Sequence, residues 1–592
     1  MKNLLYLNKY LYKYRIRLLL GILMVIGSNY FGVLIPQQIR KALDYVQGKI
    51  ELYKTADVSV RGDMYSDFNS ALFYFGLTVI GFMLLKGIFM YFMRQTIVVM
   101  SRLIEYDLRK EIFGHLEKMD LAFFKKNKTG DLMSRVSEDV GKVRMYIGPA
   151  LLYGINLVSL FVLTISSMIN VSPTLSLYTL LPLPFLSISI YYVSRMINKK
   201  SGLIQKQLGN ITSLAQETYS GIRVIKSYGK ERQFSANFKE ESEVFKTKSL
   251  DLARVNALFF PLMILLISAS NILVIYIGGL EVAKGNITPG NIAEFVMYVN
   301  MLTWPVTSIG WIASLIQQAE ASQERINELL NEESILDKSG KNLRAISGNL
   351  KFENVSFTYT DTGVHALKNI NFEIKAGEKI AIIGKTAAGK STIADLILRM
   401  YDPTGGKILL DGIPINEHDI DHLRQRIGYV PQDVFLFSDS VSNNVAFGKQ
   451  TTDQQEIETY ASYAAIHKEL SELPEGYETF VGERGVTLSG GQKQRISIAR
   501  AFIKDPDIVI LDDCLSAVDT DTERKIMSYL NKALEDKTSL IITHRIHNLL
   551  SFDKIMVIDE GKIVEYGTHD ELIDKGGYYN DLVESQSLEE IN

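Results

Sequence analysis

The first half of the chain contains long segments with few or no charged side chains. A helix rises about 1.5 Å per residue, so about 20 apolar residues cross the roughly 30 Å hydrocarbon core of a bilayer. The segments that meet this requirement are residues 18–39, 71–92 (interrupted only by Lys86), 145–194, 255–280 and 295–319. Residues 145–194 are long enough for two spans and are expected to turn at 170–173. The pattern therefore predicts six membrane-spanning helices.

Basic side chains mark one side of these predicted spans. Loops with an excess of Lys and Arg usually stay in the cytoplasm. The flanking basic residues are Arg15, Arg17, Arg94, Arg144, Arg195, Lys199, Lys200 and Arg254. The segment 4–14 mixes Leu and Tyr with lysines, a pattern typical of an amphipathic helix in the membrane interface. We therefore expect the N-terminus on the cytoplasmic side.

Two connections on this side, residues 101–144 and 199–254, are long, charged and compatible with helices. One interpretation is that they extend the spans and dock on a cytoplasmic domain through residues 123–131 and 219–229. The other is that they are solvated helical extensions, because charge runs usually form surface. We favour docking.

Two residues within the spans are open to two interpretations. Lys86 either faces a cavity, as intramembrane cations often do, or extends to the interface. Its place toward the cytoplasmic end of its span favours the interface. Trp304, beside Pro305, either lines a substrate path or packs as an interface aromatic, which is the commoner role.

Composition excludes several classes of protein. The 64 Lys and Arg residues nearly balance the 67 Asp and Glu residues, whereas nucleic-acid binders usually carry a basic excess. Cys514 is the single cysteine, so the chain forms no internal disulfide, and we expect a buried thiol. The second half mixes charged and turn residues in the manner of a soluble α/β domain.

The second half contains a phosphate-binding pattern, G-x-x-x-x-G-K-[ST]. A buried-strand pattern at 379–383 precedes it and a helix pattern at 393–400 follows, so backbone N–H groups and a helix N-terminus would face phosphates. Lys390 would neutralise the β- and γ-phosphates, and Ser391 would bind Mg²⁺. The residues of the loop are Gly384, Lys385, Thr386, Ala387, Ala388, Gly389, Lys390, Ser391 and Thr392.

A second motif is the apolar strand 508–511, which ends in two carboxylates, Asp512 and Asp513. Asp512 is placed to hold the magnesium shell. Between the two motifs lies the sequence Leu488, Ser489, Gly490, Gly491, Gln492.

With this pentapeptide the chain resembles the ATP-binding cassette family. The resemblance implies that Tyr359 stacks on adenine, that Gln432 is the Q-loop glutamine near the magnesium, that 516–519 with Asp519 is the D-loop, and that His544 is the switch histidine. Residues 481–485 and 123–135 are similar to contact segments of the exporter branch. In that branch the cassettes pair head to tail, so Ser489, Gly490, Gly491 and Gln492 would complete the partner's ATP site.

The resemblance implies a multi-domain fold: a six-helix α-helical transmembrane domain followed by an α/β P-loop ATP-binding cassette domain. We expect the membrane domain at 1–330, a linker at 331–348 and the cassette at 349–592. The expected cofactors are ATP and Mg²⁺, and the expected location is the cytoplasmic membrane with its lipids. The partners would be a second half-transporter and a small hydrophobic or amphipathic substrate.

The chain departs from the family at two positions. Asp513 stands where most members carry Glu, and a carboxylate set back by about 1 Å costs on the order of a hundredfold in rate. Ala387 stands where Gly is common. Asp513 is typical of the weak-site subunit of a heterodimer, which we favour. The alternative is a homodimer in which Asp513 acts as a slower base.

Two functions follow from these motifs. The first is ATP-driven export by alternating access. The second is a nucleotide-gated regulatory or channel-like protein that does not pump, which the shortened carboxylate supports. Lys390, Asp512, Gln432 and His544 favour the exporter.

Overall fold

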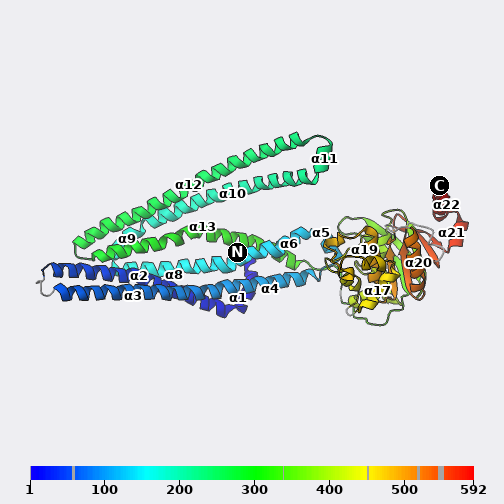
Figure 1. The fold of residues 1–592 in the computed structure, drawn as a ribbon, viewed down its shortest axis with the longest axis horizontal. Helices are drawn as coiled ribbons and strands as arrows, with labels where there is room; N and C mark the ends of the chain where they lie inside the picture. The colour runs from blue at the N-terminus through cyan, green and yellow to red at the C-terminus, as the bar shows by residue number, and fades with distance from the viewer. Residues whose placement is uncertain are drawn as a thin grey trace. The chain divides into compact units, whose positions relative to one another are not determined.

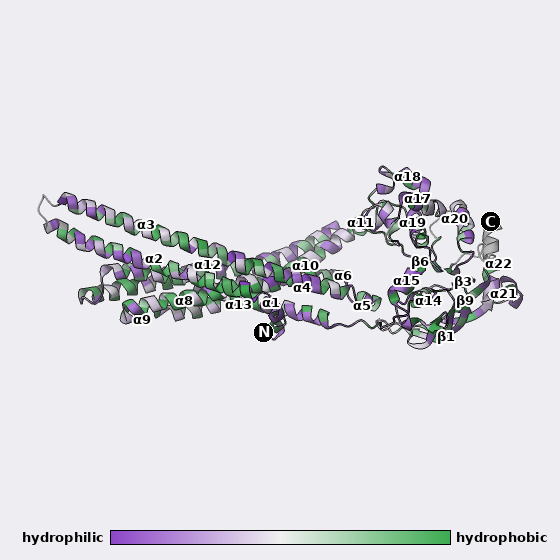
Figure 2. Ribbon diagram, turned by 90° about the horizontal axis from the view of Figure 1, so that it is seen from below, coloured by the Kyte–Doolittle hydropathy of each residue, from purple (hydrophilic) through white to green (hydrophobic). Residues whose placement is uncertain are grey.

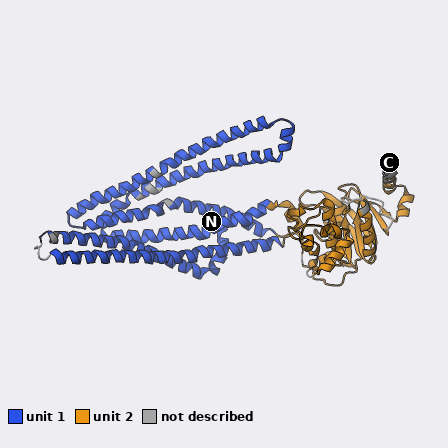
Figure 3. Cartoon of the chain, viewed as in Figure 1, with its two compact units in different colours: residues 1–117, 130–332 blue, residues 118–129, 333–592 orange. Residues whose placement is uncertain are grey.

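The computed structural model describes residues 2–55, 61–337, 339–449, 452–515, 520–543 and 552–591. The chain divides into two compact units (Figure 3). The helical unit comprises Met1–Glu117 and Gly130–Glu332, and the α/β unit comprises Lys118–Thr129 and Glu333–Asn592. A short internal segment of the first half of the sequence therefore belongs to the second unit.

The helical unit is built from long helices joined by short turns (Figure 1). Its α-helices are α1 (Asn8–Lys13), α2 (Arg15–Thr55), α3 (Arg61–Met93), α4 (Val99–Leu116), α6 (Thr129–Ser134), α7 (Val140–Met145), α8 (Leu151–Val171), α9 (Pro173–Leu180), α10 (Pro182–Ser220), α11 (Ile222–Ser227), α12 (Glu231–Ala283) and α13 (Pro289–Asn331). A 3-10 turn, η1 (Asn3–Leu7), opens the chain, and π-helical turns continue the helices at η2 (Arg94–Val98), η3 (Arg135–Asp139) and η4 (Tyr146–Ala150).

Five helices of the described chain are long and apolar enough to cross a membrane (Figure 2, green stretches). They are Arg15–Ile50, Arg61–Leu116, Thr129–Val171, Glu231–Ala283 and Pro289–Asn331. The sixth expected span falls on α9 and α10, which are divided at Leu181 before Pro182. Because Pro182 cannot donate the next helical hydrogen bond, the segment is divided into a short α9 of 8 residues and a long α10 of 39 residues.

Local caps explain where the hairpin turns. The predicted break at 170–173 is confirmed, since α8 ends at Val171 and α9 begins at Pro173. Ser172 caps α9 by accepting a hydrogen bond from the Leu175 amide at 3.2 Å. Proline at the first helical position loses no bond that an α-helix needs. The charged connections are helical as predicted, with α10 continuing to Ser220 and α12 starting at Glu231.

The N-terminal segment packs on the helical unit itself. Leu4, Leu7 and Tyr10 are buried. Lys9 pairs with Glu111 of α4 at 2.6 Å, and Lys13 pairs with Asp107 of α4 at 2.5 Å. The amphipathic pattern thus reflects apolar packing on one side and ion pairs with α4 on the other.

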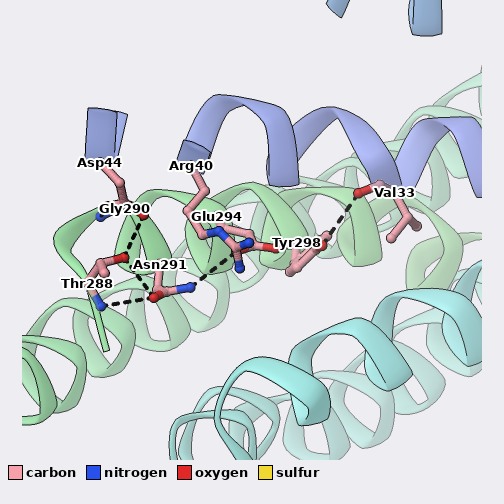
Figure 4. A network of polar contacts seen from close by, with 8 residues as sticks. All are labelled: Val33, Arg40, Asp44, Thr288, Gly290, Asn291, Glu294 and Tyr298. Carbon is pink, nitrogen blue, oxygen red and sulfur yellow. Dashed lines mark hydrogen bonds and ion pairs between the residues drawn. The ribbon is translucent and has the colours of Figure 1, made fainter. Parts of the chain in front are cut away.

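A polar network joins α2 to α13 (Figure 4). Glu294, fully buried, pairs with Arg40 at 3.1 Å and accepts a hydrogen bond from the Tyr298 hydroxyl at 2.9 Å. Asp44 accepts hydrogen bonds from the Thr288 hydroxyl at 2.8 Å and the Gly290 amide at 3.0 Å. A buried carboxylate is stable only when it is paired and hydrogen-bonded, as Glu294 is here.

The α/β unit contains two sheets. Its strands are β1 (Leu350–Thr358), β2 (His365–Ile374), β3 (Lys379–Gly384), β4 (Gly405–Leu410), β5 (Ile413–Pro414), β6 (Ile427–Val430), β7 (Ile508–Asp512), β8 (Thr538–Ile542), β9 (Lys554–Asp559) and β10 (Lys562–Gly567). The order β2-β1-β4-β5 forms an antiparallel sheet. The order β10-β9-β3-β8-β7-β6 forms a sheet that is parallel except for β10.

Helices and short helical turns complete the α/β unit. They are α5 (Leu121–Lys126), α14 (Lys390–Ile397), η5 (Ile415–Glu417), α15 (Ile420–Gln425), α16 (Val441–Ala446), α17 (Gln454–Tyr463), α18 (His467–Ser471), η6 (Gly476–Glu478), η7 (Glu483–Gly485), α19 (Gly490–Phe502), α20 (Thr520–Ala533), α21 (His569–Lys575) and α22 (Tyr578–Ile591). Strands β3 and β7 are buried along their whole lengths, except for the half-buried Lys379, and carry mainly Ile, Val and Leu, as central parallel strands require. Cys514, after β7, is buried as predicted, and burial raises the pKa of its thiol to about 12.

Helix α5 is the part of the first half that packs within the α/β unit. Leu121 and Ala122 pack against its main hydrophobic core. Asp120 caps α5 by accepting the Phe123 amide at 2.9 Å, and it also accepts the Ile335 amide at 2.6 Å and the Ser334 hydroxyl at 3.1 Å. The docking predicted for residues 123–131 is therefore observed for α5, while residues 219–229 belong to the helical unit.

The buried carboxylate of Glu294 generates a stability prediction. Glu294→Ala leaves Arg40 without its partner, so we expect a loss of about 3 kcal/mol of stability, as for other broken buried pairs. Tyr298→Phe removes one hydrogen bond and should cost about 1 kcal/mol. Thermal unfolding in detergent measures both, with the exposed Asp63→Ala as control. Equal melting temperatures for Glu294→Ala and Asp63→Ala would contradict the importance of the network.

Candidate functional site

A cavity of about 460 Å³ lies in the α/β unit beside the loop between β3 and α14. The end of β7, the start of β2 and the turn between β9 and β10 also line it. The structure thus brings together most of the site residues predicted from the sequence: Tyr359, Thr386, Ala387, Ala388, Gly389, Lys390, Ser391, Thr392, Gln432, Asp512 and Asp513.

The loop from 384 to 392 adopts backbone conformations that glycine permits. Gly389, which precedes α14, has φ 105°, and a Cβ there would lie 2.5 Å from the Ala366 carbonyl. Gly384 has φ 149°, and a Cβ there would overlap the Ile558 carbonyl. Ala387 has φ 63°, a left-handed conformation that costs a non-glycine residue about 1–2 kcal/mol. The departure noted at Ala387 is therefore a strained position.

Lys390 is held inside this loop. Its ammonium donates hydrogen bonds to the backbone carbonyls of Gly384 at 2.7 Å and Lys385 at 2.8 Å. Gly384 and Lys385, which the sequence predicted as site residues, do not line the cavity themselves but position the lysine that does. Burial lowers the pKa of Lys390, although the charges of Asp512 and Asp513 act in the opposite direction. The lysine is fixed beside the two carboxylates, where a phosphate chain needs positive charge.

The two carboxylates differ in their surroundings. Asp512 ends β7 and is only 3% exposed. Asp513 follows it with φ 45°, and its amide donates to the Ile542 carbonyl of β8 at 2.9 Å. Aspartate tolerates this left-handed conformation better than most residues because its short side chain bonds locally.

Tyr359 lies at the edge of the cavity. Its hydroxyl is 3.0 Å from the Thr392 hydroxyl, and its ring meets Phe357 and Tyr401 edge-on. The Lys125 ammonium of α5 lies 4.9 Å from the centre of the Tyr359 ring and 5.2 Å from that of Tyr401. The predicted adenine platform is therefore in direct contact with α5.

Some residues of the cavity have no signal in the sequence. His365, Ala366 and Lys368 come from β2, and Glu560 and Gly561 form the turn between β9 and β10. The Gly561 amide donates to the Ala388 carbonyl at 3.1 Å, and its carbonyl accepts from the Lys368 amide at 2.8 Å. A glycine between two strand patterns, as at Gly561, indicates a turn, but nothing in the local sequence indicates that this turn lies near the phosphate loop. The turn reaches the phosphate loop because β9 is the neighbour of β3 in the sheet.

The signature residues lie elsewhere in the unit. Ser489 caps α19 in a reciprocal arrangement with Gln492: the Ser489 hydroxyl accepts the Gln492 amide at 3.3 Å, and the Gln492 side chain accepts the Ser489 amide at 2.9 Å. Ser489 and Gly490 are exposed, Gly491 is half-buried, and none of the four lines the cavity. Asp519 and His544 lie outside the described residues.

The donor set suits Mg²⁺. Ser391, Gln432 and Asp512 supply a hydroxyl, an amide and one carboxylate to the same cavity. Mg²⁺ prefers oxygen ligands and usually takes one or two carboxylates, with water and phosphate completing its shell. Within the described chain no three His, Cys, Asp or Glu side chains gather to form an all-protein metal site.

Known proteins share both halves of this architecture. The family model described as ABC transporter transmembrane region matches residues 18–306, and the model described as ABC transporter matches residues 367–516. A probable multidrug resistance ABC transporter ATP-binding/permease protein of Bacillus subtilis is 35% identical over 581 residues, covering 97% of this chain and 96% of the relative. This chain belongs to the ATP-binding cassette transporter family.

Other known proteins are similar to this chain over most of their length. The multidrug resistance-like ATP-binding protein MdlA of Escherichia coli is 36% identical, with 82% of each chain covered. The ATP-dependent lipid A-core flippase of Pseudomonas syringae is 36% identical, covering 80% of this chain and 79% of the flippase. A solved bacterial Atm1-family ABC exporter with ATP bound superposes with a TM-score of 0.76 at 26% identity, covering 97% and 98% of the two chains.

The close approach at Gly389 generates a prediction for nucleotide binding. Gly389→Ala adds both left-handed strain and an overlap with the Ala366 carbonyl, so we expect at least a tenfold loss of ATP affinity, which corresponds to about 1.4 kcal/mol. Gly377→Ala is the matched control, since Gly377 has φ 78° but open space around its Cβ position. Titration with a fluorescent ATP analogue measures both variants. Equal losses would show that the overlap at Gly389 is unimportant.

Proposed function

We propose that this chain is one half of a dimeric exporter that uses ATP hydrolysis to move an amphipathic substrate out across the cytoplasmic membrane. The observation that carries the proposal is the cavity of about 460 Å³ in the α/β unit. It gathers the phosphate loop, the buried Asp512, Asp513 and the aromatic Tyr359, in a chain that also carries membrane-spanning helices. The family membership supports the same conclusion.

Each residue of the cavity has a distinct part in ATP hydrolysis. Tyr359 would hold adenine, and the loop amides with Lys390 would hold the phosphates. Ser391, Gln432 and Asp512 would hold Mg²⁺, which offsets phosphate charge when it is bound. Asp513 would orient the attacking water as general base, assisted by Gln432 and His544. These parts are mostly positioning, on which phosphoryl transfer depends most.

The exposed signature favours a dimer. Ser489 and Gly490 are exposed at the start of α19, a helix of 13 residues, and do not line the cavity of their own chain. Amides at a helix N-terminus, together with Ser489, suit the γ-phosphate of a nucleotide held by a second chain. Asp519 would add to the same contact.

Asp513 favours a heterodimer in which this chain forms the slow site. Its carboxylate is one methylene shorter than the glutamate common at this position. A partner with a glutamate would then use the intact signature of this chain in the faster site. The shortened carboxylate also supports the second candidate function, a nucleotide-gated protein that does not pump.

Turnover of the chain alone in lipid tests the slow-site proposal. We expect the wild type to remain near the Lys390→Ala blank, and Asp513→Glu to raise turnover by about tenfold to a hundredfold, because the carboxylate moves forward by about 1 Å. Asp513→Asn is the control that keeps the side-chain length and removes the charge. High turnover of the wild type would favour a homodimer instead.

Transport distinguishes the two candidate functions. Inside-out vesicles containing the chain with its partner should accumulate a fluorescent amphiphile only when ATP is present. Nucleotide binding without accumulation would support the gated alternative.

Asp120 generates a prediction for coupling, because it ties α5 to the segment that leads into β1. Burial opposes the charge of Asp120, but the hydrogen bonds from Phe123, Ile335 and Ser334 lower its pKa below the ordinary value. Asp120→Ala should therefore loosen α5. We expect faster amide exchange over 121–126 and a severalfold loss of substrate-stimulated ATPase, with basal ATPase retained.

Asp337→Ala is the matched control for Asp120→Ala, since the Asp337 carboxylate accepts hydrogen bonds from the nearby Ser339, and the backbone carbonyl that Arg399 binds is kept in alanine. Unchanged exchange over α5 in Asp120→Ala would contradict the role given to Asp120.

A further inference from the structure

A second cavity, of about 770 Å³, lies within the helical unit. Residues of α2, α3, η2, α8 and α13 line it, together with Val99 of α4 and Pro149 of η4. Its volume falls in the range of pockets that take drug-sized ligands, which is about 300–1,000 Å³. The cavity is separate from the nucleotide site and lies among the membrane-spanning helices.

The charges of this cavity are all positive. Lys86 of α3 and Arg94 of η2 line it, and its lining contains no Asp or Glu. Lys86 is half-buried, and its side chain runs past Gly32 of α2, where an added Cβ would lie 3.5 Å from the ammonium. The structure therefore places Lys86 against the cavity, whereas the sequence favoured the membrane interface.

The buried carboxylates of the helical unit have partners, whereas Lys86 is half-buried and Arg94 is exposed. Glu294 pairs with Arg40, Asp139 with Arg325, and Glu105 with Arg109 at 2.9 Å. Among the described residues neither Lys86 nor Arg94 has an ion-pair partner within 4.0 Å. Unpaired cations among membrane helices are costly, and they commonly mark a binding path for an anion.

The rest of the lining mixes apolar and aromatic residues with the polar residues Ser28, Asn29, Gln95, Asn156 and Asn300. Met90, Leu152 and Met301 line it together with Tyr153 and Trp304. The Tyr153 ring packs edge-on against Trp304 and Trp311, with distances between ring centres of 5.3 Å and 5.5 Å. Trp304 is thus both a packing aromatic and part of the cavity wall. Cations together with flexible or aromatic apolar groups in one cavity match a molecule with a charged head and a hydrophobic tail.

We propose that this cavity binds amphiphiles with an anionic head, such as a phosphate or carboxylate. Lys86 and Arg94 contact the head, and Tyr153, Trp304 and the methionines contact the tail. Charge complementarity carries the inference: a bound anion supplies the counter-charge that the lining lacks. The inference rests on the proposed export function, for which it names the substrate class.

The two tryptophans allow a direct binding measurement. The chain contains only Trp304 and Trp311, so Trp311→Phe leaves the cavity tryptophan as the single reporter. The full chain is reconstituted in nanodiscs of zwitterionic lipid without nucleotide. Quenching of Trp304 is then followed with three probes that share one brominated undecyl tail and carry a phosphate, a phosphocholine or a trimethylammonium head.

We expect the phosphate probe to bind at least tenfold more tightly than the other two. Lys86→Gln combined with Arg94→Gln should abolish this preference and leave quenching by the phosphocholine probe unchanged. Lys206→Gln is the control, because Lys206 is an exposed cation of α10 outside the cavity. A preference that is absent, or that survives the double substitution, overturns the proposal.

A further experiment tests whether the anionic head belongs to a membrane lipid or to a soluble amphiphile. Two-chain brominated phosphatidylglycerol is compared with phosphatidylcholine carrying the same tails. A charge preference for the two-chain probe supports a lipid source, and one confined to the single-chain probe supports a soluble source. Binding is measured here without ATP. A negative result would therefore contradict the proposed anionic substrate class alone, and the vesicle transport experiment would still test the export function separately.

Discussion

A lipid bilayer offers no water to backbone amides, carbonyls or charges, and this constraint shapes the helical unit. Each span must satisfy its hydrogen bonds internally, which favours long helices and caps that close every break. Ser172 at the start of α9 and Thr288 at the start of α13 are such caps. The same constraint requires Arg40 beside the buried Glu294. Against this background Lys86 and Arg94 are informative, because both line a cavity whose described lining contains no carboxylate.

A different constraint governs the α/β unit, where the backbone must approach a phosphate chain closely. Parallel strands β3 and β7 are separated by β8, so the loops at their carboxyl ends are neighbours. This places the loop of Lys390 beside Asp512, although about 120 residues separate them in sequence. Left-handed backbone at Gly389 and Ala387 turns the loop toward the cavity. The cost of these conformations is balanced by the buried sheet beneath them.

The sequence predicted the membrane spans and the motifs well because both are local patterns. Charge-free segments, the break at 170–173 and the phosphate loop each depend on neighbouring residues alone. Pro182 and Pro184 were expected to kink a helix of this segment, and the structure divides it at Leu181, directly before Pro182. The sequence predicted that residues 123–131 dock on a cytoplasmic domain, and α5 does pack within the α/β unit. Its contacts through Asp120 and Lys125 could not be predicted, because they depend on tertiary packing. The same holds for His365, Glu560 and Gly561, which the sheet order alone brings to the cavity.

The two departures from the family pattern share one physical feature. Ala387 and Asp513 both lie at positive φ, in the loop and directly after β7. Aspartate adopts that conformation at a lower cost than glutamate does, because its shorter side chain can bond to the local backbone. The shorter carboxylate therefore suits the backbone at Asp513, and under the weak-site proposal it would hold the charge farther from the attacking water. Aspartate in place of glutamate would thus stabilise the backbone after β7 and position the attacking water less well. Such a site is better suited to holding nucleotide than to hydrolysing it, as the weak-site proposal requires.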